Sequence, residues 1–140
     1  SIVDKVNRER AEAIAREAAE QCERIDWPEI REPVKLLRLL GDWPSDVPLV
    51  YGDESGGGVP VKSCVAADTN AHDRRWAILA GPEGGFTPEE LAALRRLKAA
   101  HGVGLGPRIL RADTAIITLC VATLLAWGDW HQPPRFEQGT

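Results

Sequence analysis

Residues 76–90 read WAILAGPEGGFTPEE and contain the clearest structural pattern of the chain. The apolar start of this stretch predicts a strand, which leads directly into a glycine-rich corner at 81–86. Thr87 is placed to cap a following helix, with Pro88 at its first position and Glu90 completing a capping box. Because strand, glycine corner and helix follow one another directly, the stretch is typical of an α/β protein.

The same alternation extends along the chain in both directions. Helices are predicted over 8–25, from Pro33 to Gly41, over 88–101 and over 112–127, and strands over 47–51, 76–80 and 103–105. The glycine-rich segment 52–60 predicts a flexible loop, and 61–67 slightly favours a short helix. We therefore expect an α/β fold with a mostly parallel sheet and flanking helices, in one domain over 1–130, followed by a polar, flexible tail at 131–140.

Composition excludes several classes of protein. The 140 residues are 44% hydrophobic, yet none of the apolar runs approaches the ~20 residues of a membrane helix. The formal net charge of −4 argues against non-specific binding of nucleic acid, so an RNA-directed role would need a local patch or a helper module. Three cysteines without a CxxC pair favour reduced thiols in a cytoplasmic protein.

Glycines follow three of the predicted strands, in 51–53, 80–85 and 105–108. Each glycine either makes only a turn or lets the backbone approach a ligand, and three corners of matching placement favour a ligand cleft. A dinucleotide fingerprint fails because Pro107 stands where its third glycine belongs. The three histidines, at 72, 101 and 131, are scattered and predict no metal site. With a dinucleotide and a metal set aside, the ligand that the glycine corners favour is a nucleoside-type cofactor held largely by backbone groups.

Two groups of basic residues have alternative interpretations. Arg108 and Arg111 flank the last corner and could bind an oxyanion, or an arginine could pair locally with Asp113. On the helix predicted after Thr87, residues 95–98 carry three cations, for which a solvated face is favoured over a binding stripe.

Two segments, 80–90 (AGPEGGFTPEE) and 105–115 (LGPRILRADTA), resemble the RsmE family of SPOUT-class methyltransferases. Residues 16–24 (REAAEQCER), followed by Pro28, are similar to the family's first-helix motif. Members methylate N3 of a uridine in 16S ribosomal RNA of the small ribosomal subunit. The resemblance implies the same activity here, a C-terminal trefoil knot that general topology rules would not suggest, and a homodimer.

The resemblance also implies that S-adenosyl-L-methionine is the cofactor and lies in the knot. The residues implied to bind it come from two corners: Leu79, Ala80, Gly81, Pro82, Gly84, Leu105, Gly106, Ile109 and Leu110. The transferred methyl group is already activated, so catalysis rests mostly on positioning. Arg108 is the first candidate, and Arg111 the second, to stabilise the anion left when uracil N3 loses its proton. Glu83 is a candidate for orienting the substrate or balancing the sulfonium charge.

The sequence departs from the family pattern in two ways. The family usually carries Glu where this chain has Asp113. An N-terminal PUA-like barrel, and the first strand and helix of the methyltransferase domain, are not visible before Ser1. An alternative is therefore a truncated module that binds cofactor and dimerises without methylating RNA by itself, and a weaker one is a flavodoxin-like carrier.

Overall fold

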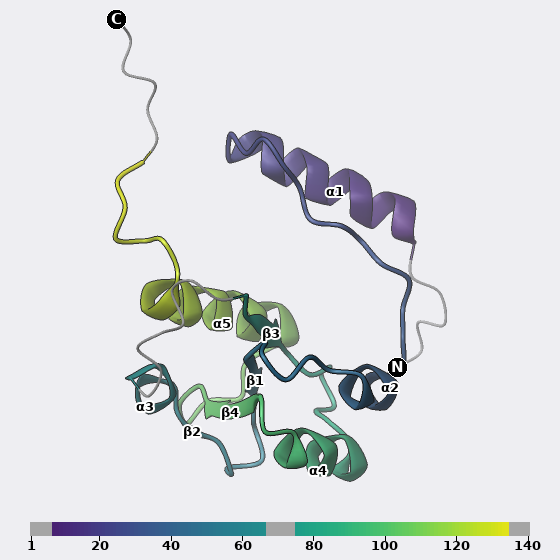
Figure 1. Ribbon diagram of the computed structural model, residues 1–140, viewed down its shortest axis with the longest axis vertical. Helices are drawn as coiled ribbons and strands as arrows, with labels where there is room; N and C mark the ends of the chain where they lie inside the picture. The colour runs from purple at the N-terminus through teal and green to yellow at the C-terminus, as the bar shows by residue number, and fades with distance from the viewer. Residues whose placement is uncertain (1–6, 67–74, 135–140) are drawn as a thin grey trace, which may run out of the picture. The chain divides into compact units, whose positions relative to one another are not determined.

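The buried run predicted as the first strand forms the centre of a four-stranded sheet. The computed structural model describes residues 7–66 and 75–134 and divides into two compact units, Ser1–Leu39 and Leu40–Thr140 (Figure 1). The sheet belongs to the second unit, and its strands are ordered β2-β4-β1-β3. These are β1 (Leu49–Gly52), β2 (Val59–Pro60), β3 (Ala77–Leu79) and β4 (Ala100–Gly104).

All strand pairs are parallel, as predicted. The central strand β1 pairs with β3 from Leu49↔Ala77 and with β4 from Leu49↔Ala100. Its residues are almost wholly apolar because a central parallel strand is covered on both faces. The carboxyl ends of the strands consequently lie at one edge of the sheet.

Helices cover both faces of this sheet (Figure 1). On one side, α5 (Ala112–Trp127) packs on β1 and β3, with α3 (Val61–Ala66) beside it. The buried core there is Val50, Val103, Leu119 and Trp127. On the other side lies α4 (Pro88–Arg96), whose Leu94 is fully buried. The predicted capping box is confirmed: Thr87 accepts from the Glu90 amide at 3.1 Å, and the Glu90 carboxylate accepts from the Thr87 amide at 2.9 Å.

Two predicted boundaries around β4 are wrong. The helix predicted over 88–101 ends at Arg96, and the strand predicted over 103–105 is the longer β4. Residues 97–101 have helical composition, but pairing with β1 places His101 opposite Val50. Tertiary pairing here outweighs a weak local preference.

The segment predicted as a plain loop over 52–60 contains β2. This two-residue strand pairs with β4, opposite Val103 and Gly104. Pro60 is tolerated because β2 is an edge strand, where one backbone donor can be spared.

The first unit contains α1 (Arg8–Gln21) and an extended segment, residues 24–35, called here the return segment. Helix α2 (Leu36–Gly41) crosses the boundary between the two units. The predicted helix ends are displaced here too. Helix α1 stops four residues before Ile25, since Glu23 adopts a left-handed conformation (φ 54°) that a helix cannot continue. Helix α2 begins at Leu36 rather than at Pro33.

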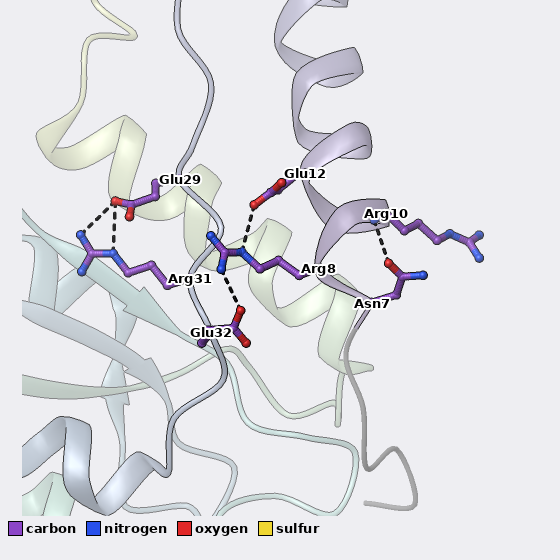
Figure 2. A network of polar contacts seen from close by, with 7 residues as sticks. All are labelled: Asn7, Arg8, Arg10, Glu12, Glu29, Arg31 and Glu32. Atoms are coloured by element: carbon purple, nitrogen blue, oxygen red, sulfur yellow. Dashed lines mark hydrogen bonds and ion pairs between the residues drawn. The ribbon is translucent and has the colours of Figure 1, made fainter.

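Polar contacts tie α1 to its return segment (Figure 2). The predicted cap is confirmed, as the Asn7 side chain accepts from the Arg10 amide at 3.0 Å. Arg8 donates to Glu12 at 2.9 Å within α1 and to Glu32 at 2.7 Å in the return segment. These side chains are exposed, so each pair contributes little stability.

Candidate functional site

A pocket of about 720 Å³ lies where the carboxyl ends of β1, β3 and β4 meet. Its walls are the three segments that follow these strands, together with Leu91 of α4 and Ala115 of α5. The sequence-based expectation of a cleft at three glycine-bearing strand ends is therefore met in the geometry.

The wall after β3 is the segment 80–86. Gly85 has a φ of 74°, which favours glycine, and its amide donates to the Pro82 carbonyl at 2.8 Å. A side chain at Gly81 would come within 3.3 Å of the Phe86 ring. That ring meets Tyr51 of β1 edge to face, with centroids 6.1 Å apart. The corner is thus fixed to the centre of the sheet.

The wall after β4 is the segment 105–110. Gly106 has a φ of 98°, which turns the chain out of the strand. Ile109 is 85% exposed, an unusual position for a large apolar side chain beside a pocket. Arg108 also lines the pocket and is exposed.

The wall after β1 contains a buried carboxylate, Asp53, which is only 6% exposed. It accepts from the amide and the hydroxyl of Ser55 and, at 3.3 Å, from Nη2 of Arg95 on α4. Burial raises the pKa of Asp53, but the hydrogen bonds from Ser55 and Arg95 outweigh burial and hold that pKa below its ordinary value. Asp53 is therefore a paired anion inside the pocket wall.

Most residues predicted to bind the cofactor or act in catalysis are brought together by the pocket. Its lining includes Ala80, Gly81, Pro82, Glu83, Gly84, Leu105, Gly106, Arg108, Ile109 and Leu110. Leu79 and Arg111 are outside the lining. Arg111 instead makes an exposed ion pair with Asp113 at 3.5 Å, the local pairing that the sequence had left as one alternative.

Sequence reasoning assigned no site residue to the β1 wall. Residues of 52–60 line the pocket: Gly52, Asp53, Glu54, Ser55, Gly56, Gly58 and Pro60. The signal was the acidic and glycine-rich sequence directly after a buried strand. The interpretation of Arg95 as part of a solvated face was also incomplete, because its guanidinium reaches Asp53 and Ser55.

The described ranges, 7–66 and 75–134, hold no group of three His, Cys, Asp or Glu side chains suited to a metal ion. His101 lies on β4, and His72 lies outside the described residues. Within the same ranges, none of the helices has the length and hydropathy needed to span a membrane.

The sheet order, the flanking helices and the glycine-walled pocket define an α/β domain with a ligand pocket at the strand ends. Its fold is that of the SPOUT-class rRNA methyltransferases, as similar solved structures show. Several solved structures share this fold, among them two that are similar over 91% of this chain. One, a probable rRNA-methyltransferase from Porphyromonas gingivalis, has a TM-score of 0.75 and 27% identity, over 91% of this chain and 52% of that protein. The other, from Neisseria gonorrhoeae, has a TM-score of 0.72 and 24% identity, over 91% of this chain and 52% of that protein, and shows the fold alone.

The family model of the RNA methyltransferase domain matches residues 2–124, and this chain belongs to that family. It is similar to ribosomal RNA small subunit methyltransferase E of Rickettsia conorii (34% identity, 81% of this chain) and of Bacillus subtilis (36% identity, 79% of this chain). The chain spans 45% and 44% of the length of these relatives. The implied trefoil knot stays a prediction.

Proposed function

We propose that this chain is the methyl-transferring domain of an enzyme that uses S-adenosylmethionine to methylate small-subunit ribosomal RNA at N3 of a uridine. The observation that carries the proposal is the pocket walled by 80–86 and 105–110, in a domain of the RNA methyltransferase family. A methyltransferase-like protein of Legionella pneumophila, 27% identical with a TM-score of 0.64 over 88% of this chain and 51% of that protein, contains bound S-adenosylmethionine.

The pocket fits such a cofactor in size and in chemistry. Its volume falls within the roughly 300–1,000 Å³ of small-molecule sites. The glycines leave backbone amides and carbonyls open to a ligand; at Gly84, for instance, an added Cβ would meet no atom within 4 Å. Leu105, Ile109 and Leu110 supply apolar surface for an adenine ring.

Arg108 is the residue proposed to act on the substrate. When bound, S-adenosylmethionine supplies a methyl group already activated by its sulfonium. Uracil N3 becomes a nucleophile when its proton passes to solvent at the open pocket, and the negative charge left on the ring then spreads to the ring oxygens. Arg108 lines the pocket, and a planar, cationic guanidinium is suited to stabilising that anion.

Glu83 and Arg111 have secondary roles in the proposal. Glu83 lies in the wall after β3 and is exposed, so it can orient the substrate or balance a cation in the pocket. Arg111 follows two residues after Ile109 and can contact RNA at the pocket rim by leaving its exposed pair with Asp113.

We further propose that two copies of this chain form a homodimer in the cytoplasm, where small ribosomal subunits are available. One face of α5 is buried, whereas Ile117, Val121 and Leu125 form an exposed apolar stripe on another face. A second copy of this stripe would cover it, as isologous interfaces do.

The proposal is tested by calorimetry with S-adenosylmethionine beside a transfer assay. Small ribosomal subunits lacking the modification are incubated with the chain and labelled cofactor, and the digested nucleosides are identified by mass spectrometry. We expect saturable cofactor binding and label in N3-methyluridine. Label in a different nucleoside contradicts the assigned position, and failure to bind the cofactor contradicts the proposal as a whole.

A second candidate is a cofactor-binding and dimerising module without RNA methylation by itself. It is favoured by the net charge of −4, which argues against binding RNA without a basic patch or a helper module. Cofactor binding without transfer to ribosomal subunits would support this candidate over the first.

A further inference from the structure

Asp53, Ser55 and Arg95 form a polar group, the Asp53 cluster, that joins helix α4 to the pocket wall after β1. A single nitrogen, Nη2 of Arg95, donates to Asp53 Oδ2 at 3.3 Å and to Ser55 Oγ at 2.7 Å. The Ser55 hydroxyl in turn donates to Asp53 Oδ1 and accepts from the Gly57 amide at 3.3 Å. The cluster thereby ties three alternate positions of the wall, 53, 55 and 57, to α4.

The wall is shaped to receive the guanidinium. A Cβ at Gly57 would come within 2.7 Å of Arg95 Nη2, so a side chain there would require the guanidinium to shift. A Cβ at Gly58 would come within 2.7 Å of the Val103 backbone. The wall is therefore pressed against β4 on one side and against Arg95 on the other.

The opposite end of α4 is fixed to the wall after β3. The capping box of Thr87 and Glu90 holds the point where the segment 80–86 enters the helix. From Thr87 to Arg95 the helix rises about 12 Å, at roughly 1.5 Å per residue. Leu94, which is fully buried, anchors the helix to the core between these two points.

We propose that α4 is a rigid element that sets the distance between the pocket walls after β1 and β3. In this proposal Arg95 and Asp53 are positioning residues for the ligand. The proposal rests on the proposed function, since it takes S-adenosylmethionine as the ligand. Neither residue is assigned a part in methyl transfer: Asp53 already accepts three hydrogen bonds from Ser55 and Arg95, and Arg95 is outside the pocket lining. They act by holding Glu54, Ser55 and Gly56 in place as lining.

The test replaces Arg95 with methionine, which keeps an apolar stem and removes the guanidinium. Arg96→Met is the matched control, because Arg96 is the adjacent exposed arginine of the same helix. Two quantities are measured on the 140-residue chain: the Kd for S-adenosylmethionine by calorimetry at 25 °C, and amide hydrogen exchange at Ser55 and Gly57 without ligand.

For Arg95→Met we expect faster exchange at both amides and a Kd raised about tenfold, the scale of one lost charged hydrogen bond. Arg96→Met should change neither quantity. Arg95→Lys should restore much of the affinity, since one nitrogen makes both contacts. Asp53→Asn should weaken binding of S-adenosylmethionine as Arg95→Met does. Agreement between the two variants would show that the effect is not due to the introduced methionine.

Three outcomes overturn the inference. If Arg95→Met and Asp53→Asn bind the cofactor as the parent does while exchange accelerates, the cluster is structural only. If exchange is unchanged, Arg95 does not hold the wall. If the parent itself fails to bind S-adenosylmethionine, the proposed function fails and the inference falls with it, whatever the exchange data show.

Discussion

Arg108 and Arg111 stand three residues apart but have different surroundings. Arg108 lines the pocket, whereas Arg111 begins α5 and pairs with Asp113 outside it. A charge that stabilises a developing anion acts over a few ångströms, so position relative to the pocket separates the two.

Arg108→Ala is expected to lower methyl transfer by about 10²–10³, the usual effect of removing one electrostatic donor. Cofactor binding should largely survive, because the backbone walls remain. Single-turnover transfer and calorimetry measure the two quantities. Arg96→Ala is the control for a lost surface charge, and full activity of Arg108→Ala would remove the residue from the mechanism.

The structure leaves no space for a side chain at Gly102. A Cβ there would lie 2.8 Å from the Tyr51 ring, in the middle of the β1–β4 pair. Gly102→Ala should therefore lower the free energy of unfolding by about 1–3 kcal/mol, as overpacking does. Gly84→Ala is the control, since Gly84 faces open space. Urea denaturation compares the two, and equal stabilities would contradict the close packing.

Asp53 predicts a pH dependence of stability. Its folded pKa is below the ordinary value, so its contribution is complete above the unfolded pKa of about 3.9 and is lost as pH falls through the folded pKa. At pH 7, Asp53→Asn should lower the free energy of unfolding by about 1–2 kcal/mol, a modest figure because Arg95 is half exposed. The difference between parent and variant should shrink below about pH 4; a constant difference would exclude an ionic contribution.

At the scale of elements, α5 combines a buried face with the exposed stripe of Ile117, Val121 and Leu125. Leu125→Arg is expected to convert the proposed homodimer to a monomer, since a charge would enter an apolar interface. Analytical ultracentrifugation measures the mass, with Glu89→Arg at an exposed position of α4 as the control for added charge. A parent that is monomeric at high concentration would contradict the dimer.

Local patterns predicted elements best where one signal dominated. The capping box at Thr87 and the buried run around Val50 lie where they were expected. The predictions of a helix through His101 and of a plain loop over 52–60 were wrong, because pairing between distant strands forms β4 and β2 there. Such pairing is set by tertiary contacts that composition does not encode.

At the scale of the whole molecule, much of the candidate site could be predicted because the carboxyl ends of parallel strands lie at the same edge of the sheet. The corner at 51–53 was among the three expected, but its contact with Arg95 could not be predicted, since Arg95 lies forty-two positions later in the chain than Asp53. The sequence predicted one domain over 1–130, and its composition gave no signal for the two compact units that meet at Leu39 and Leu40.

The two edge strands of the sheet differ in how readily they could pair with a strand of another molecule at high concentration. Strand β2 is two residues long and includes a proline, so it gives an incoming chain little to pair with. Strand β3, at the other border, is three residues of ordinary backbone. If two molecules join backbone to backbone, we therefore expect the sheet to extend at β3 rather than at β2, and a proline introduced into β3 should hinder such growth.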